Sequence, residues 1–296
     1  MDIVITYVNG LDPLWQQDYA AAVGGTALTK RFRDWGTLRY LLRGIEKNMP
    51  FVGNVFLLVS RESQVPEWVD RSKVRIVLHS DIIPEEYLPV FNASAIEMFI
   101  HRIPGLGEEY LYFNDDVFPV LPCKEEDFFE GGKPNIGMRR QLLVLRNPFR
   151  ALVRHDDRFA RKMAASPCRS LFYVRPQHTV TPMLRSQCEE LYGKATDAIL
   201  ASVTPLRRNG NFNQYLFTDY VYYKGLTNHK RISNKHFSLA VSNASKVCEF
   251  LKNPDCALVC INDVQMPQEK FESLQRELLS AFESILPEFS RFELQK

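Results

Sequence analysis

Three short apolar runs rich in β-branched residues constrain the fold of this chain more than any other sequence feature. The runs extend from Ile3 to Val8, from Val55 to Val59 and from Val74 to Leu78, and each is typical of a buried strand. Between the first two runs, residues 36–48 carry three leucines and an isoleucine at helical spacing. Because a strand, a helix and a second strand follow one another, the sequence predicts a parallel sheet with a right-handed crossover.

Later segments extend this alternation. We expect a helix from about Ser94 to His101, followed by a strand from Glu109 to Phe113. A helix from Met183 to Tyr192, an apolar strand from Ala257 to Ile261 and an amphipathic helix spanning Phe271 to Ile285 come after it. The sequence therefore predicts an α/β fold with a Rossmann-like, mostly parallel sheet flanked by helices.

The size and charge of the chain limit its architecture and its partners. With 296 residues, 45% of them hydrophobic, the chain can bury one large core, and we predict a single catalytic domain over residues 1–296. A formal net charge of only +2 gives no reason to expect nucleic acid as a partner. Positive charge gathers locally at residues 138–167, a predicted insertion. We favour a solvated mobile loop there over a binding site for an anionic acceptor.

The six cysteines and the N-terminal residues give two further expectations. The closest cysteine pair, Cys256 and Cys260, matches no paired zinc spacing, so we expect reduced core thiols that bind no metal. The first residues resemble no secretory signal, and no apolar stretch approaches the ~20 residues of a membrane span. We therefore expect a cytoplasmic protein, with a peripheral position at the inner face of the membrane as the alternative.

Polar residues directly after the predicted strands are candidate ligand-binding groups, because ligands of open α/β sheets bind at the carboxyl ends of the strands. Asn114, Asp115 and Asp116 follow the strand that ends at Phe113. Their oxygen atoms suit Mg²⁺ or Mn²⁺ held against a diphosphate. A strand-ending turn with side-chain hydrogen bonds is the alternative interpretation.

Two further segments offer groups for a nucleotide and its phosphates. The turn containing Asn9, Gly10 and Asp12 exposes backbone N–H groups that suit a nucleotide, and Gly10 permits a positive φ there. Arg33 offers a two-pronged guanidinium for phosphate oxygens just before a helix. A plain connection and a solvated helix entry are the respective alternatives.

His178 is the strongest histidine candidate. It lies in a loop-like stretch next to arginine and is a candidate general base toward an acceptor hydroxyl. A satisfied core or surface histidine is the alternative. The other five histidines, His79, His101, His155, His229 and His236, show no feature beyond that ordinary role.

Taken in order, these segments resemble the signature blocks of the Stealth family of phosphotransferases. Their first blocks are Asp2 to Trp15, Arg31 to Glu46, Pro66 to Trp68, Phe91 to Glu97, His101 to Gly105, and Tyr112-Phe-Asn-Asp-Asp-Val117. The later blocks are His178, Thr204 to Tyr215, Val259-Cys-Ile-Asn-Asp263, and Leu286 to Glu293. Tyr7, Val180 and Pro205 depart from the family pattern. The resemblance spans nearly the whole chain apart from residues 139–167.

The resemblance implies a nucleotide-sugar transferase-like fold and a specific reaction. A sugar 1-phosphate, GlcNAc-1-phosphate or another hexose-1-phosphate, passes from a UDP-sugar such as UDP-GlcNAc to a carbohydrate hydroxyl in capsule or exopolysaccharide synthesis, with release of UMP. It implies Asp116, Asp115, His178 and Arg207 as catalytic residues and Asn92, Glu97, Asn114 and Asp263 as groups that orient ligands. The acceptor is an oligosaccharide or polysaccharide, and peripheral association with polysaccharide-export machinery is a further expectation.

Two other functions fit the same residues. A conventional glycosyltransferase uses the same donor, but its acceptor attacks the sugar carbon and releases UDP. A non-catalytic carbohydrate-binding subunit needs no complete set of acid, base and cation. The released nucleotide, UMP or UDP, distinguishes sugar 1-phosphate transfer from conventional glycosyl transfer. The presence of the acidic pair together with His178 and Arg207 argues against a non-catalytic subunit.

Overall fold

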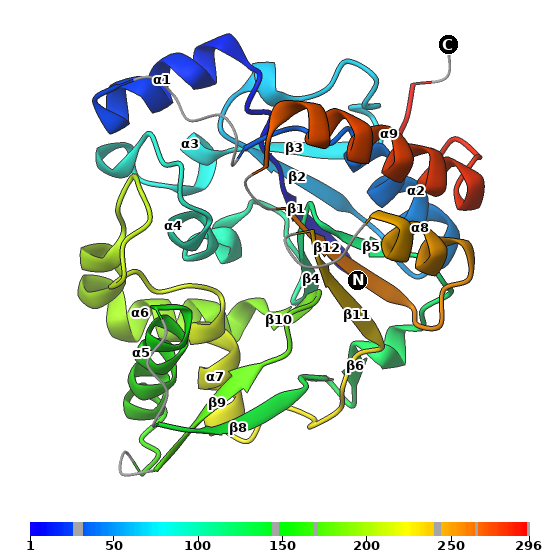
Figure 1. Ribbon diagram of the computed structural model, residues 1–296. Coiled ribbons are helices and arrows are strands. Elements are labelled where there is room, and N and C mark those ends of the chain that lie inside the picture. Colours follow the sequence, from blue (N-terminus) through cyan, green and yellow to red (C-terminus); the bar gives the residue numbers. More distant parts are fainter. Residues whose placement is uncertain (26–31, 144–147, 168–170, 240–243, 264–265, 295–296) are drawn as a thin grey trace.

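The computed structural model describes residues 1–25, 32–143, 148–167, 171–239, 244–263 and 266–294. Arg31 and Cys168, which entered the sequence predictions, lie outside this set. Figure 1 shows two adjoining sheets with helices on both sides. The main sheet contains β1 (Asp2–Thr6), β2 (Val55–Val59), β3 (Val74–Leu78), β4 (Glu109–Asn114) and β10 (Thr181–Leu184). Its order is β10-β4-β1-β2-β3, and only β10 runs antiparallel to its neighbour.

A second sheet adjoins the first through a tight turn. It has the order β11-β12-β5, formed by β11 (Asn234–Ser238), β12 (Leu258–Asn262) and β5 (Val117–Pro119). Asp115 and Asp116 are the turn residues between β4 of the main sheet and β5 of the second. Two small pairs complete the strands: β6 (Phe129–Glu130) with β7 (Lys133–Pro134), and β8 (Met138–Leu142) with β9 (Phe172–Pro176).

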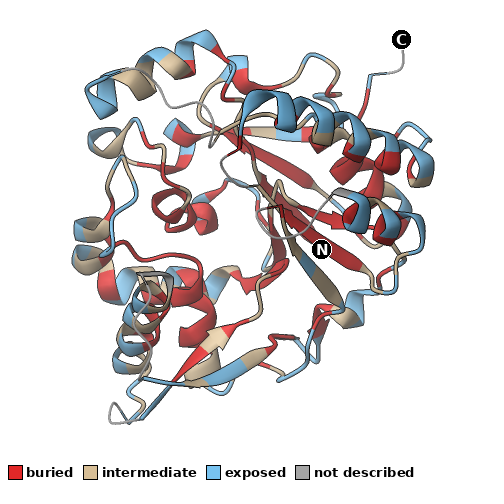
Figure 2. Ribbon diagram, in the orientation of Figure 1, coloured by how far each residue is buried: buried red, intermediate tan, exposed pale blue. Residues whose placement is uncertain are grey.

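The helices cover both faces of the sheets. Their bounds are α1 (Pro13–Val23), α2 (Leu38–Asn48), α3 (His79–Ile82), α4 (Ala93–Glu97), α5 (Pro148–Met163), α6 (Arg185–Ser202), α7 (Tyr215–Tyr223), α8 (Ala244–Lys252) and α9 (Gln268–Ile285). Buried residues of α2, α8 and α9 share one hydrophobic core, and those of α4, α6 and α7 share another. Strand β1 separates the cores, since Ile3 and Ile5 face the first and Val4 faces the second. Figure 2 shows the buried strands between the helices.

The predicted α/β fold with a mostly parallel sheet is confirmed. The second and third predicted strands have the observed bounds, and the apolar stripe of α2 packs into the first core. Among the described helices, none combines the length and apolar character needed to cross a bilayer.

Two sequence predictions about local structure are wrong. Met183 and Leu184 end strand β10 rather than begin a helix, which starts at Arg185. Pro182 is tolerated in this strand because β10 is an edge strand, where a missing N–H leaves no central ladder bond unpaired. The predicted helix from Ser94 also ends early, at Glu97, and a short 3₁₀ turn at Ile100–Arg102 follows it.

The basic stretch is not the mobile loop that we predicted. Its described residues form β8 and the helix α5, which packs on α7. Val153 and Asp156 of α5 are fully buried. Asp157 accepts a hydrogen bond from the backbone N–H of Val174 at 2.9 Å and lies 3.3 Å from the guanidinium of Arg161. The charge count therefore concealed a packed helix, on which Arg158 and Lys162 are exposed while Arg161 pairs with the buried Asp157.

Candidate active site

A single large cleft lies where the two sheets meet. Its volume is about 1120 Å³, and segments from the whole chain line it. Eight of the predicted site residues line this cleft: Arg33, Glu97, Asn114, Asp115, Asp116, His178, Arg207 and Asp263. They come from the ends of β4 and β12, from α4 and from three connecting segments, so the fold gathers residues that are far apart in sequence.

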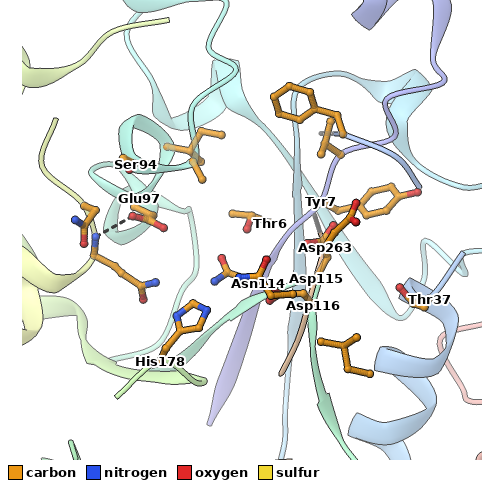
Figure 3. Close-up of a pocket in the computed structure, with 18 of the residues that line it drawn as sticks. Thr6, Tyr7, Thr37, Ser94, Glu97, Asn114, Asp115, Asp116, His178 and Asp263 are labelled. Atoms are coloured by element: carbon orange, nitrogen blue, oxygen red, sulfur yellow. Dashed lines mark hydrogen bonds between the residues drawn. The ribbon is translucent and has the colours of Figure 1, made fainter. Parts of the chain in front are cut away.

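The turn after β4 places two carboxylates in the cleft wall (Figure 3). Burial, the neighbouring Asp116 and the carboxylates of Asp34 and Asp263 raise the pKa of Asp115 to about 8. Burial raises the pKa of Asp116 to about 6. Oδ1 of Asp116 is buried and has no hydrogen-bond partner among the described residues. This wall therefore concentrates negative charge that a cation or a proton must compensate.

His178 lies in the connection between β9 and β10 and lines the cleft. In the view of Figure 3 it lies to the left of the turn residues Asp115 and Asp116. Burial, with contributions from His236 and Arg175, lowers the pKa of His178 to about 4. Its ring is therefore neutral at pH 7 and can accept a proton. Nδ1 lies 3.4 Å from the hydroxyl of Tyr215, which leaves Nε2 for a ligand.

Glu97, at the end of α4, organises the neighbouring wall. Its Oε2 accepts a hydrogen bond from the backbone N–H of Gln214 at 2.8 Å, drawn in Figure 3, and its Oε1 accepts one from the hydroxyl of Tyr112 at 3.2 Å. Burial raises the pKa of Glu97 to about 7, an effect that the positive charge of Arg207 opposes. Glu97 thus fixes the segment that follows Arg207 and places a carboxyl group near that guanidinium.

Arg33 and Asp34 form the wall next to α9. One guanidinium nitrogen of Arg33 donates to the carbonyl of Met266 at 3.0 Å, and the guanidinium lies over the ring of Phe271. The other terminal nitrogen, Nη1, has no hydrogen-bond partner among the residues that the structure describes. The hydroxyl of Tyr7 donates to Asp34 at 3.0 Å. These contacts hold Arg33 in place while leaving one donor for an anionic ligand.

Asn9, Gly10, Asp12 and Asn92 are not among the residues that line the cleft. Asp12 is the N-cap of α1, accepting from the backbone N–H groups of Leu14 and Trp15. Asn92 is the N-cap of α4 and donates to Oδ1 of Asn211 at 3.0 Å.

Gly10 has a different structural task from the one we predicted. It does not adopt a positive φ. A Cβ at this position would meet the carbonyl oxygen of Phe32, which is why a glycine stands there. The contacts of this turn and of Asn92 shape the cleft from behind.

Sequence reasoning missed several residues of the cleft wall, namely Tyr7, Asp34, Arg139, Arg175, Gln214, Arg231, Lys235 and His236. His236, considered an ordinary histidine, has its ring centroid 5.5 Å from that of His178. Local sequence could place His236 on a strand. It could not predict which strand lies beside that one, and so could not bring His236 to the cleft.

Comparison with known proteins identifies the family. Residues 31–136 match the family model described as Stealth protein CR2, conserved region 2. The receptor polysaccharide phosphotransferase WefC of Streptococcus oralis is 30% identical, with 99% of each chain covered. The chain belongs to the Stealth family. The capsular polysaccharide phosphotransferase WcwK of Streptococcus pneumoniae is 29% identical, again with 99% of each chain covered. The Stealth protein described here is accordingly an enzyme, a phosphotransferase.

Solved structures are much more distant. A galactosyltransferase, LgtC, solved in complex with donor and acceptor sugar analogues, is similar at 11% sequence identity with a TM-score of 0.39. The similarity covers 93% of this Stealth chain and 95% of that chain. At this level it supports no conclusion about function.

The acidic wall suits Mg²⁺ or Mn²⁺ only with help from a substrate. Within the described part of the chain, no three carboxylates bring oxygen atoms within 4.8 Å of one another. Mg²⁺ is commonly held by one or two carboxylates together with substrate phosphates. Oδ1 of Asp116, which has no hydrogen-bond partner in the described part of the chain, and the raised pKa of Asp115 fit that arrangement.

Proposed function

We propose that this Stealth protein transfers a sugar 1-phosphate, GlcNAc-1-phosphate or another hexose-1-phosphate, from a UDP-sugar to a carbohydrate hydroxyl in capsule or exopolysaccharide synthesis. The acceptor is an oligosaccharide or polysaccharide, and one catalytic domain over residues 1–296 carries the reaction. The observation that supports this proposal is the meeting of Asp115 and Asp116, a neutral His178, and the guanidinium groups of Arg33 and Arg207 in one cleft.

The proposed reaction needs few covalent roles from the protein. The acceptor oxygen attacks the phosphorus that carries the sugar, and its proton passes to Nε2 of His178. A new oxygen–phosphorus bond forms as the bond to UMP breaks, leaving the sugar joined to the acceptor through a phosphodiester. Positioning and charge stabilisation dominate such transfers.

Each wall of the cleft contributes to that stabilisation in the proposed mechanism. Arg33, whose Nη1 has no hydrogen-bond partner among the described residues, and Arg207 are the proposed clamps for the phosphate oxygens. A Mg²⁺ or Mn²⁺ ion held by Asp115 and Asp116 would neutralise phosphate charge. Glu97, Asn114 and Asp263 are proposed to orient the donor, while the contacts of Asn9, Gly10, Asp12 and Asn92 support the surrounding walls.

The released nucleotide tests this proposal against conventional glycosyl transfer. The protein is incubated with UDP-GlcNAc, Mg²⁺ and a panel of oligosaccharide acceptors, and the nucleotide and product are analysed by chromatography and mass spectrometry. UMP with a phosphodiester-linked product is the expected result. UDP with a directly glycosylated product would instead assign the protein to conventional glycosyltransferases. Reactions with other UDP-hexoses show whether UDP-GlcNAc was the wrong donor. A reaction without any UDP-sugar gives the background against which absent activity is judged.

A further inference from the structure

A group of nitrogen and sulfur donors lies beside the cleft and shares one member, His178, with the proposed transfer site, whereas its other two members have no part in that transfer. Donor atoms of His178, His236 and Cys260 all lie within 4.8 Å of one another. His178 and His236 line the cleft, whereas Cys260 is buried directly behind it. Two imidazole nitrogens and a sulfur form a donor set different from the oxygen-rich wall at Asp115.

The backbone arrangement explains why these three residues meet. Strands β11 and β12 are parallel, and their register makes His236 the direct partner of Cys260. Neighbouring residues in register share one face of a sheet. The third donor, His178, comes from the connection between β9 and β10.

Hydrogen bonds fix that connection against β11. The side-chain amide of Asn234 donates to the carbonyl of His178 at 2.9 Å. Gln177 donates to the carbonyl of Ile232 at 2.8 Å and accepts from the N–H of Ile232 at 3.2 Å. The donors are therefore positioned by three separate contacts, which lowers the entropic cost of gathering them around an ion.

We propose that His178, His236 and Cys260 form a binding site for Zn²⁺. Zinc favours tetrahedral sets of imidazole and thiolate ligands, with bonds of about 2.0–2.1 Å to nitrogen and about 2.3 Å to sulfur. Donor atoms within 4.8 Å of one another reach that geometry through small side-chain rotations. Magnesium, by contrast, favours oxygen ligands, so the two kinds of ion select different walls of the cleft.

Asp116 lies next to this group but is not one of the three residues whose donor atoms lie within 4.8 Å of one another. Its Oδ2 lies 3.6 Å from Sγ of Cys260, while its Oδ1 is buried without a partner among the described residues. The thiol gives up its proton when it binds the metal, and both histidines bind as neutral imidazoles.

Metal binding by the full chain, without donor or acceptor, tests the proposal independently of the transfer reaction. Metal-free protein is titrated with Zn²⁺ in competition with a chromophoric chelator, and Co²⁺ replaces Zn²⁺ for absorption spectroscopy. We expect one equivalent of Zn²⁺ and a thiolate-to-cobalt charge-transfer band. Cys260→Ser should remove that band, and both Cys260→Ser and His236→Ala should weaken Zn²⁺ binding by about tenfold or more.

Matched substitutions outside the group provide the controls. Cys256→Ser changes a nearby thiol and His229→Ala changes another exposed histidine, and neither should alter binding or the spectrum. Less than one equivalent of Zn²⁺, or equal binding by wild type and His236→Ala, would overturn the proposal. Because the side chain of His236 is exposed, this variant decides the outcome even if Cys260→Ser does not fold.

Discussion

Asp115 and Asp116 occupy the turn between the two sheets, where burial, the neighbouring Asp116 and the carboxylates of Asp34 and Asp263 raise the pKa of Asp115. Burying several carboxylates together disfavours their ionised forms, so a proton or a cation must compensate their charge in the cleft. A divalent ion and the phosphates of a donor would supply that compensation. The charge of these side chains is therefore the property that substitutions should change.

Removing the charge of Asp116 tests its proposed role. We expect Asp116→Asn to reduce transfer by about 10²-fold or more, because an amide is a poor replacement for an anionic ligand near the reacting phosphate. Steady-state kinetics with UDP-GlcNAc and an accepted oligosaccharide measure the loss. Asp197→Asn, on the exposed face of α6, is the control. Wild-type turnover by Asp116→Asn would exclude a direct role for this carboxylate.

The acidic limb of the pH profile should report the carboxylates and not His178. The pKa of Asp115 is raised to about 8 and that of Asp116 to about 6, whereas the pKa of His178 is lowered to about 4. Lower pH protonates the carboxylates and weakens Mg²⁺ binding, so more Mg²⁺ should move the limb to lower pH. Profiles of kcat/KM between about pH 5 and 9 at two Mg²⁺ concentrations measure this shift. An unmoved limb would contradict the assignment.

Sequence reasoning at this scale succeeded where a local rule applied. The rule that ligands bind at the carboxyl ends of strands brought Asp115 and Asp116 to the cleft. The same rule gave Asp12 a ligand role, but its turn pattern is equally satisfied by an N-cap, which the structure contains. His236 lies beside Cys260 because of the register between β11 and β12. The sequence of either strand alone does not predict that register.

At the scale of elements, α2 packs unusually close to the second sheet. A Cβ on Gly44 would lie 2.5 Å from the carbonyl oxygen of Pro119, at the end of β5. The same helix carries Arg43, whose guanidinium makes two hydrogen bonds to the carboxylate of Glu293, at 2.8 Å and 3.2 Å. Helix α2 therefore joins the strand after the acidic turn to the C-terminal segment.

The close approach at Gly44 gives a paired prediction. Gly44→Ala should destabilise the fold by about 1–3 kcal/mol, because the backbone of β5 must move to admit the methyl group. Gly193→Ala, on α6, where the added methyl meets no described atom within 4 Å beyond its chain neighbours and its own helix backbone, should stabilise it by about 0.5–1 kcal/mol. Urea or thermal unfolding measures both. Equal effects from the two substitutions would contradict this account of α2 packing.

The buried pair of Arg43 and Glu293 gives a second prediction at this scale. Glu293→Gln should cost about 3 kcal/mol, because the buried guanidinium loses its buried carboxylate partner and keeps only the exposed Glu283. Glu288→Gln, on an exposed neighbouring residue, should change stability by less than about 0.5 kcal/mol. Chemical unfolding of the three proteins measures the difference. A cost for Glu293→Gln no larger than that control would show that the pair adds little.

The whole molecule carries little net charge but distributes it unevenly. The formal net charge is +2, yet Arg33, Arg139, Arg175, Arg207, Arg231 and Lys235 all line the cleft. Composition alone gave no reason to expect these cationic groups in one cleft, which acidic residues also line, namely Asp34, Glu97, Asp115, Asp116 and Asp263. Folding brings these cationic groups and the acidic turn to one cleft, and an anionic nucleotide donor should sense both.

Ionic strength should therefore affect binding of the donor more than the chemical step. Raising NaCl from about 0.05 to 0.3 M shortens electrostatic range below about 10 Å, so we expect the KM for the UDP-sugar to rise several-fold with a smaller change in kcat. Arg231→Gln should raise the KM at low salt and reduce its salt dependence. Arg276→Gln, on the exposed face of α9, removes the same charge outside the cleft and should retain the wild-type slope. If both variants keep that slope, the cationic groups of the cleft do not guide the donor, and the contacts of Arg33 and the acidic turn must account for its binding.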